Sequence, residues 1–325
     1  MWRLDAADRN GLPYVGLVGI PASGEQWTIR RGGHEATLVQ VGGGVRTYTV
    51  DGVDVVAGYG PDEKAASGRG QLLMPWPNRI RDGKYTFDGT EQQLSITEVP
   101  LHNASHGLVR WAQWQLVRVQ AGEGALTLRH RLLPQPGWDG ILDLVVDYSL
   151  GDDGLTVTTT ATNLGANRVP FGYGAHPYIA LGDTSLGDVE LTLPAAREVL
   201  VDDRSIPTST EPVRPETDFR QGRRLGDSRL DTAYTNLDRD GDGRWRVTVG
   251  GLADRPPVTL WGDEAFGWVQ AFTAKGEDDF TQGVRGIAVE PMSCPANAFN
   301  TGEGLVVLEP GQSWTGTWGI GPSTG

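Results

Sequence analysis

Residues 142–164 read LDLVVDYSLGDDGLTVTTTATNL. The two flanks, Leu142–Leu150 and Leu155–Leu164, are rich in the β-branched and aromatic residues that suit extended strands. Between them, Gly151-Asp152-Asp153-Gly154 supplies turn residues, because Asp and Gly both tolerate positive φ. The stretch therefore predicts one long β-hairpin.

The same signature recurs along the chain. Seven Asp-Gly dipeptides occur among 46 glycines and 20 prolines, and short strand-like segments flank them. Helical apolar periodicity is nearly absent, and the best helical candidate, Asp62–Ala66, is only about one turn long. We therefore expect residues 1–325 to form a single, mainly antiparallel, all-β domain whose strands split into packed sheets. The dipeptides begin at Asp51, Asp82, Asp88, Asp139, Asp153, Asp240 and Asp242, and the clearest further strands are Val45–Val50, Leu155–Ala161, Arg244–Val249 and Trp314–Ile320.

One segment departs from this pattern. Arg197–Asp227 has weak strand signals and many proline, arginine and acidic residues. Such composition is typical of connections that run over the surface, so we expect a long surface excursion there.

Composition limits the class of function. The net charge of −13 argues against a nucleic-acid partner and mildly against strongly anionic substrates, although a local basic pocket could override the overall field. A single cysteine, Cys294, excludes an internal disulfide framework and a four-thiolate zinc site. No run of about 18 apolar residues predicts a membrane span. Met1–Asp5 lacks the flank of a signal peptide, so a cytoplasmic location is expected.

Two of the five histidines have a spacing that could suit a metal. His102 and His106 are four residues apart, but the residues between them do not predict a helix and include no glutamate as in zinc proteases. We expect no metal there. His34 and His130 lie in ordinary strand-like contexts, where a surface or edge role is expected.

His176 has a more suggestive setting. It lies in Phe171-Gly-Tyr-Gly-Ala-His176-Pro-Tyr178, where glycines let the backbone approach a ligand and aim the ring into a cleft. A histidine held by backbone carbonyls in a tight corner fits the same residues equally well. Its titration near neutral pH makes it a candidate acid or base.

Glu290 is the corresponding acidic candidate. It follows the apolar run Gly286–Val289 and precedes Pro291, which indicates a buried strand ending in a carboxylate. Partial desolvation there would raise its pKa and make it a better base. A carboxylate that pairs with an arginine to close a loop is the alternative. Glu309 enters a Pro-Gly turn, where a structural role is favoured.

Other candidates have less support. Asp238–Gly243 spaces its acids like the start of a calcium loop, but position twelve is Val249, so an acidic hairpin turn is favoured. Cys294 has no basic neighbour in sequence, which disfavours a catalytic role. Tryptophans could stack on a sugar ring in a cleft, and Trp76, Trp261 and Trp268 are the candidates, with core packing the alternative for each.

Several segments, in order, resemble the aldose 1-epimerase (galactose mutarotase) family over residues 30–320. Each motif alone has little specificity, and their order and spacing carry the resemblance. The segments are Pro77–Phe87, Asn103 with His106-Gly107, Gly174–Tyr178, Leu230-Asp231, Val289–Met292, Asn297–Asn300 and Leu308–Gly311.

The resemblance implies a large antiparallel β-supersandwich and an enzyme that interconverts the α and β anomers of a free monosaccharide. It implies that His176 protonates the ring oxygen, that Glu290 removes the proton of the C1 hydroxyl, and that His106 helps to orient the sugar. An acid and a base on opposite sides of the sugar avoid charged intermediates. Arg79, Asp231 and, less strongly, Asn78 are expected to bind hydroxyls. No cofactor or metal is implied, and the protein is expected to be a monomer or homodimer.

Two rival functions remain open at the level of sequence. Pro291–Ala296 differs from the best-known galactose mutarotases, which leaves the sugar undecided. An epimerase of a sugar 6-phosphate would need a basic pocket, and Arg214, Arg220, Arg223 and Arg224 are the candidates for it. A carbohydrate-binding β-sandwich without turnover is the other rival.

Overall fold

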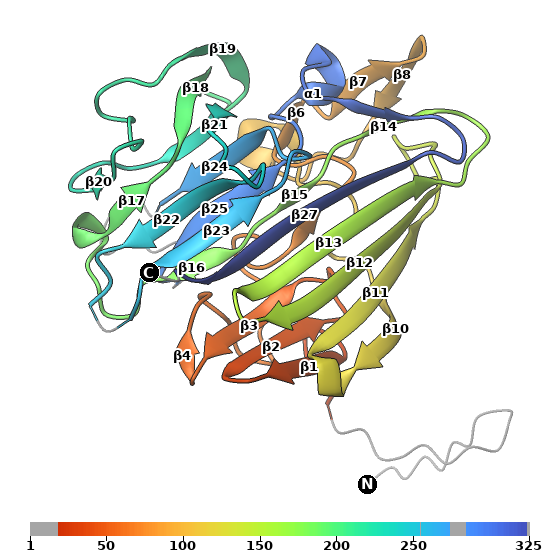
Figure 1. The fold of residues 1–325 in the computed structure, drawn as a ribbon. Coiled ribbons are helices and arrows are strands. Elements are labelled where there is room, and N and C mark those ends of the chain that lie inside the picture. The colour runs from red at the N-terminus through yellow and green to blue at the C-terminus, as the bar shows by residue number, and fades with distance from the viewer. Residues whose placement is uncertain (1–18, 254, 274–283, 324–325) are drawn as a thin grey trace, which may run out of the picture.

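The computed structural model describes residues 19–253, 255–273 and 284–323, and strands dominate it (Figure 1). All strand pairings among these residues are antiparallel, which confirms the all-β prediction. Helical structure in the described part is limited to α1 (Ala298–Thr301) and three 3₁₀ turns, η1 (Val99–Leu101), η2 (Ala121–Glu123) and η3 (Leu186–Asp188). None of the described helices has the length and apolarity needed to cross a membrane. Met1–Asp5, on which the signal-peptide prediction rests, lies outside the described residues.

The larger sheet has nine strands, and in Figure 1 it sweeps from β17 at the left to β10 at the lower right. At its centre is the hairpin predicted from the sequence, with Leu142 opposite Asn163 and Gly151 opposite Gly154. In spatial order the strands are β10 (Gln115–Gln120), β11 (Ala125–Leu132), β12 (Leu142–Gly151), β13 (Gly154–Asn163), β27 (Ser313–Pro322), β23 (Val258–Gly262), β22 (Trp245–Gly250), β17 (Glu190–Thr192) and β20 (Arg223–Arg224).

The second sheet has eight strands, seven of which follow one path while the eighth, β16, pairs with β25 beside it. Along the path lie β19 (Pro207–Pro212), β18 (Ala195–Val201), β21 (Asp231–Leu237), β24 (Trp268–Phe272), β25 (Gly286–Met292), β15 (Gly174–Ala175) and β5 (Leu72–Leu73); β16 spans Tyr178–Ala180.

Smaller sheets complete the described part. One has four strands in sequence order, β1 (Gln26–Arg31), β2 (His34–Val39), β3 (Val45–Val50) and β4 (Val53–Asp54). Three two-stranded sheets join β6 (Arg79–Arg81) with β9 (Asn103–Ser105), β7 (Lys84–Phe87) with β8 (Thr90–Gln93), and β14 (Val169–Phe171) with β26 (Val306–Leu308).

The alternation of side chains along the strands builds the core. In β12, Leu142, Leu144, Val146 and Tyr148 are buried while the residues between them are more exposed, as the period of two in a strand requires. The main apolar cluster joins these residues to buried residues of the eight-stranded sheet. Burying many apolar side chains in this way supplies the main favourable term for folding.

The best helical candidate of the sequence, Asp62–Ala66, does not form a helix. Residues 61–63 form a turn in which Glu63 N donates to Gly60 O at 3.1 Å, and no helix follows. A five-residue segment has too few hydrogen bonds to offset the cost of helix nucleation.

An Asp-Gly dipeptide closes a β-hairpin only where the strands on either side of it pair with each other. The dipeptides at Asp51, Asp88 and Asp153 close the hairpins β3–β4, β7–β8 and β12–β13. At Asp238–Gly243 the local turn is tight, with Asp240 N donating to Arg244 O at 2.8 Å. However, the hairpin prediction is wrong there, because β21 belongs to the eight-stranded sheet and β22 to the nine-stranded one.

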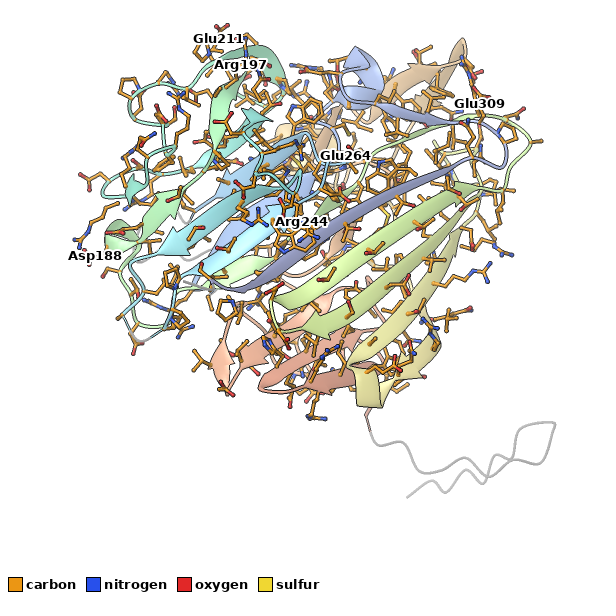
Figure 2. All side chains as sticks on the ribbon, viewed as in Figure 1. Asp188, Arg197, Glu211, Arg244, Glu264 and Glu309 are labelled. Carbon is orange, nitrogen blue, oxygen red and sulfur yellow. The ribbon has the colours of Figure 1, made fainter. Side chains whose placement is uncertain are left out.

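The surface excursion predicted at Arg197–Asp227 is also wrong in its first part. Most of β18 and all of β19 fall within it and form a hairpin at the edge of the eight-stranded sheet, where Figure 2 shows Arg197 and Glu211. Prolines 207 and 212 hid this strand from sequence analysis. Proline is tolerated in an edge strand because a missing N–H breaks no ladder bond on the open side.

The two kinds of Asp-Gly turn give a matched test of stability. Gly154 has φ +115°, and a Cβ there would lie 2.4 Å from Ile320 O. Gly154→Ala should therefore lower the free energy of unfolding by about 1–3 kcal/mol, measured by urea denaturation. Gly241→Ala is the control, since its Cβ would meet nothing within 4 Å and its φ is not positive. It should be neutral or stabilise by up to about 1 kcal/mol. Equal losses in both variants would contradict the assignment of strain to Gly154.

Candidate active site

Glu290 lies inside the eight-stranded sheet. It is on β25, every residue of which is buried, and its neighbour across the sheet is Gln270 on β24. The strand continues through Met292, so the prediction that it ends at the carboxylate is wrong by two residues. Glu290 is only 3% exposed, so its carboxyl group is almost entirely removed from bulk water.

His176 lies beside Glu290, in the link between β15 and β16. Its backbone N donates to Gln71 O at 3.0 Å, and its O accepts from Gly70 N at 2.9 Å. These bonds fix the backbone and leave the ring directed at the carboxyl, with Nε2 3.3 Å from Glu290 Oε1. The expectation of an acid and a base on opposite sides is not met, because the two groups touch.

Close packing holds the imidazole in place. The Tyr178 ring stacks on it with centroids 5.0 Å apart and an interplanar angle of 13°. Gly68, at φ +76°, also contacts the ring, because a Cβ at that position would lie 2.7 Å from His176 Cδ2. The ring therefore has little freedom to turn away from Glu290.

Burial shifts the two groups in opposite senses. Desolvation lowers the pKa of His176. Desolvation, together with the nearby charge of Asp231, raises the pKa of Glu290 well above its usual range, and the Arg79 charge opposes this rise. Burial thus disfavours both a doubly protonated pair and a pair without a proton. Over a wide range of pH the pair shares a single proton.

His106 completes the group of titratable side chains. Its ring packs edge-on against His176 with centroids 5.6 Å apart. Burial lowers its pKa, and the charges of His176, Arg110 and Arg79 lower it further, so the ring is neutral at ordinary pH. Gly107 fixes this corner, because a Cβ there would lie 2.1 Å from Met74 O.

The remaining predicted residues form one hydrogen-bonded chain. The Arg79 guanidinium donates to both oxygens of Glu98 at 2.8 and 2.9 Å, and to Asn78 Oδ1 at 3.1 Å. Gln270 joins Asn78 to Asp231, accepting from Asn78 Nδ2 at 3.4 Å and donating to Asp231 Oδ1 at 2.7 Å.

Glu98 and Gln270 were missed by sequence analysis. Gln270 is placed by its position opposite Glu290 in the sheet, and Glu98 by its ion pair across the β6–β9 unit. Neither has a local signal in the sequence, since strand partners far apart in the chain define both positions.

All six predicted site residues line one cleft of about 650 Å³. Among the residues that line this cleft, four buried polar atoms have no hydrogen-bond partner in the described part of the chain: Ser67 Oγ, Glu290 Oε2, His106 Nδ1 and His176 Nδ1. Buried polar atoms are rarely left unsatisfied, so these atoms are suited to a polar ligand. The six residues are Asn78, Arg79, His106, His176, Asp231 and Glu290.

The tryptophans singled out from the sequence do not line this cleft. Trp76 is buried and packs edge-on against Phe299 at 5.7 Å, as the core alternative predicts. Trp261 lies on the nine-stranded sheet beneath the Arg244 guanidinium, which Figure 2 labels, at 3.8 Å. Trp268 packs against Gly304. A different residue, Trp111, lines the cleft and is 46% exposed.

The arginines proposed for a phosphate pocket do not line this cleft either. Arg214 pairs with Glu198, Arg220 with Asp218, and Arg224 with Asp188, while the Arg223 guanidinium donates to backbone carbonyls. Their positive charges are thus occupied elsewhere on the surface.

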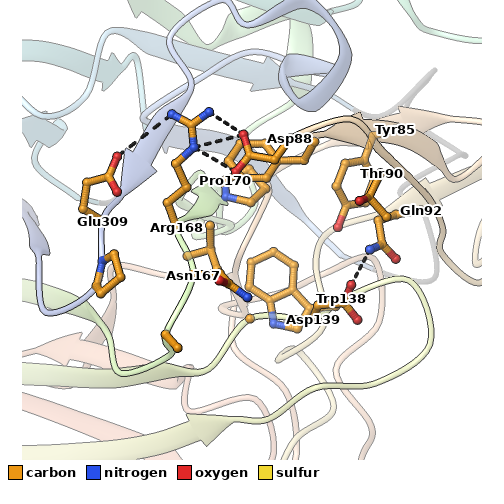
Figure 3. Close-up of a pocket in the computed structure, with 15 residues that line it drawn as sticks. Tyr85, Asp88, Thr90, Gln92, Trp138, Asp139, Asn167, Arg168, Pro170 and Glu309 are labelled. Atoms are coloured by element: carbon orange, nitrogen blue, oxygen red, sulfur yellow. Dashed lines mark hydrogen bonds and ion pairs between the residues drawn. The ribbon is translucent and has the colours of Figure 1, made fainter.

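A second cavity, of about 430 Å³, contains Glu309 (Figure 3). There Arg168 lies between Asp88 and Glu309, with its Nε 2.8 Å from Asp88 Oδ2 and its Nη1 4.0 Å from Glu309 Oε1. Glu309 also begins a turn in which Gln312 N donates to its carbonyl. These contacts give Glu309 the structural setting expected from its Pro-Gly turn.

The spacing of His102 and His106 brings no ligands together. The His102 ring is exposed and lies 3.0 Å from Asp82 Oδ1, whereas His106 lies in the cleft. Within residues 19–253, 255–273 and 284–323, no three His, Cys, Asp or Glu side chains are grouped to hold a metal ion.

Comparison with known proteins agrees with this geometry. The family model described as aldose 1-epimerase matches residues 25–320. The uncharacterized protein YihR of Escherichia coli strain K12 is 34% identical over 303 residues, covering 93% of this chain and 94% of YihR.

Solved structures share the fold at low identity. A galactose mutarotase-like protein from Clostridium acetobutylicum superposes with a TM-score of 0.79 at 18% identity, covering 91% of this chain and 95% of the other. Galactose 1-epimerase from Lactobacillus acidophilus gives a TM-score of 0.72 at 17% identity, with 92% and 95% coverage.

The only cysteine gives a test of how closed this part of the sheet is. Cys294 is fully buried just after β25, and burial raises the pKa of its thiol to about 12. Because the thiolate is the reactive form, iodoacetamide at pH 8 should label the native protein at least about tenfold more slowly than the protein in guanidinium. Mass spectrometry measures the labelling. Equal rates would contradict the burial of this segment.

Proposed function

We propose, because this chain belongs to the aldose 1-epimerase family, that it interconverts the α and β anomers of an aldopyranose, with His176 and Glu290 as its acid–base pair. The contact between His176 Nε2 and Glu290 Oε1, at 3.3 Å in a buried cleft, carries the proposal. Ring opening of a hemiacetal needs one proton delivered to the ring oxygen and another removed from the C1 hydroxyl. Both oxygens are bonded to C1, so adjacent acid and base groups can reach them together.

Ring opening transfers one proton in each direction. Glu290 takes the proton of the O1 hydroxyl, a C1–O1 double bond forms, the C1–O5 bond breaks, and O5 takes a proton from His176. The pair begins as imidazolium and carboxylate and ends as imidazole and carboxylic acid. Its total of one proton is unchanged, and the form in which the step ends, with neither group charged, is the one that burial favours.

Reclosure reverses these roles. Rotation about C1–C2 presents the other face of the carbonyl to O5. Glu290 then returns its proton to O1 while His176 takes the proton of the O5 hydroxyl, and the C1–O5 bond forms again. The enzyme is restored with the opposite anomer bound. No net proton is exchanged with solvent, so the cleft can stay closed to water during the reaction.

The other cleft residues hold the sugar. A neutral His106 donates a hydrogen bond near the ring oxygen without adding a second positive charge beside His176. Asp231, Asn78 and Arg79 face Glu290 from the side of the C1 and C2 hydroxyls, because the charges of Asp231 and Arg79 act on Glu290. Their mutual hydrogen bonds fix these groups before the sugar arrives, which lowers the entropy cost of orienting it.

A binding module without turnover fits the site less well. Two ionisable groups buried in contact are costly to maintain, and recognition of sugar hydroxyls does not require them. Polarimetry of freshly dissolved α-glucose and α-galactose separates the two functions. Tight sugar binding by calorimetry without any accelerated rotation would support the binding module and refute the enzyme.

Substitution of either member of the pair tests the assignment. Glu290→Gln and His176→Ala should each lower kcat by about a hundredfold to ten-thousandfold, because each removes one proton-transfer group. Glu309→Gln is the matched control: it makes the same change at a carboxylate in the second cavity and should retain activity. Thermal unfolding of all three variants shows whether they fold. A Glu309→Gln variant as inactive as Glu290→Gln would mean that the base is wrongly assigned.

The dependence on pH tests the shared proton. The lowered His176 pKa means that a second proton joins the pair only well below the usual imidazole value of 6.5. The raised Glu290 pKa means that the pair keeps its one proton well above the usual carboxyl value of 4.5. We therefore expect kcat to form a broad plateau across neutral pH, bounded by the apparent pKa values of the coupled pair. A rate that already falls between pH 7 and 6 would contradict this protonation state.

A further inference from the structure

Arg110 is a cation of the cleft that lacks a counter-ion. Its side chain makes no hydrogen bond and no ion pair within the described residues, and it is half-buried. The nearest acid acting on it is Glu98, both of whose oxygens already accept from Arg79. Desolvation lowers the pKa of Arg110, as expected for a cation removed from water without a partner.

The backbone around Arg110 is fixed although its guanidinium is not. Its carbonyl accepts from Gln71 Nε2 at 2.8 Å, and Gly42 packs against the same carbonyl. The main chain therefore fixes where the Arg110 side chain leaves the cleft wall, while its guanidinium has no hydrogen bond among the described residues to give up when it turns toward a ligand.

A second cation and an aromatic ring lie beside it. Lys64 Nζ lies 5.8 Å, and Arg110 Cζ 5.5 Å, from the centroid of the Trp111 ring. Lys64 also has no ion pair among the described residues, and all three side chains line the cleft. One part of the cleft wall thus has two positive charges around an exposed indole, and Glu98, the acid that acts on Arg110, is already paired with Arg79.

His106 and His176 indicate which part of the bound sugar would lie beside Arg110 and Lys64. Arg110 lies four residues after His106, whose ring packs edge-on against His176 at 5.6 Å, and the Arg110 charge acts on both histidines. Glu290 is affected instead by Asp231 and by Arg79, whose charge also acts on His106. In the proposed reaction His176 faces the ring oxygen and Glu290 faces O1. A group on the ring-oxygen side and away from C1 is attached to C5, which carries the exocyclic carbon C6.

We propose that the preferred substrate is an aldopyranose with an anionic group on C6, which Arg110 and Lys64 receive beside Trp111. This inference rests on the proposed function, since it uses His176 and Glu290 to orient the ring. Sulfonate, phosphate and carboxylate share the required chemistry, because guanidinium and ammonium groups bind all three through charge-assisted hydrogen bonds. The net charge of −13 makes such a local pair of cations necessary, because the overall field repels anions.

The experiment compares glucose with its 6-phosphate, its 6-deoxy-6-sulfonate and glucuronate. Exchange between anomeric NMR signals gives kcat/KM for each sugar after subtraction of the protein-free rate. We expect at least one anionic sugar to exceed glucose by about 10- to 100-fold, and its advantage to shrink as salt rises from 0.02 to 0.5 M, about where screening becomes short-ranged. The best of the three arms identifies the anion.

Variants assign the preference to Arg110 and Lys64. Arg110→Gln should reduce the anionic-to-neutral ratio of kcat/KM by about 10- to 100-fold. Lys64→Gln should reduce it less, because Lys64 is more exposed, and this surface change keeps the test valid if Arg110→Gln fails to fold. Arg118→Gln is the control: it removes an equal charge from an exposed position on β10 and should leave the ratio unchanged.

Each result decides the inference. Acceleration of glucose with no anionic sugar preferred overturns the anionic substrate and leaves the proposed function standing. A preference that survives in Arg110→Gln and in Lys64→Gln overturns the assignment to these cations. No acceleration of any sugar overturns the proposed function itself. A salt-sensitive preference that is lost in Arg110→Gln and kept in Arg118→Gln supports the inference.

Discussion

A histidine and a glutamate held in contact inside a β-sheet are energetically demanding, and much of the surrounding structure serves to keep them there. Separately, each buried charge would cost several kcal/mol of desolvation after relaxation. The cost falls when the two share one proton, because the neutral form of the pair then becomes available. The position of Glu290 within β25, between β24 and β15, fixes its main chain inside the sheet. Burial of the pair is therefore the origin of both its energetic cost and its reactivity.

The cations of the cleft differ in how far nearby acidic groups neutralise their charges. Among these cations the Arg79 charge is the one that acts on Glu290, yet its Nε and Nη2 both donate to Glu98 and its Nη1 donates to Asn78. Without Glu98, Arg79 would be free to pair with Glu290 and would lower its pKa strongly. Glu98 thus keeps the base at a raised pKa while Arg79 still closes the chain through Asn78 to Gln270. This arrangement depends on the pairing of β6 with β9, which places Asn78, Arg79 and Glu98 together.

The sequence predicts what depends on local chemistry. The hairpin at 142–164 is found with strand ends within one residue of those predicted, because strand propensity, alternation and turn chemistry agree there. His176 and Glu290 could be nominated from their local sequence, but Asn78, Arg79, His106 and Asp231 were assigned roles only by resemblance, because the convergence of these residues depends on strands far apart in the chain. The same limit explains the errors. Whether the turn at Asp238–Gly243 joins partner strands, and whether Arg197–Val201 lies within a sheet, depends on tertiary pairing that no local pattern shows.

Arg110 shows why an energetic anomaly is more informative than a motif. Its sequence neighbours, Val109 and Trp111, give no sign of function, and its chemistry becomes visible only when the partners of the other cleft residues are known. A half-buried guanidinium costs free energy in the empty protein, whereas an exposed residue at that position would not. Destabilised groups of this kind persist where a ligand offsets the cost on binding, so the penalty in the free protein becomes affinity in the complex. The orphaned oxygen of Glu290 and the free nitrogens of His106 and His176 follow the same logic beside the reacting atoms. The cleft thus has unpartnered groups in two places, and one molecule with hydroxyls at C1 and C2 and an anion at C6 would complete both.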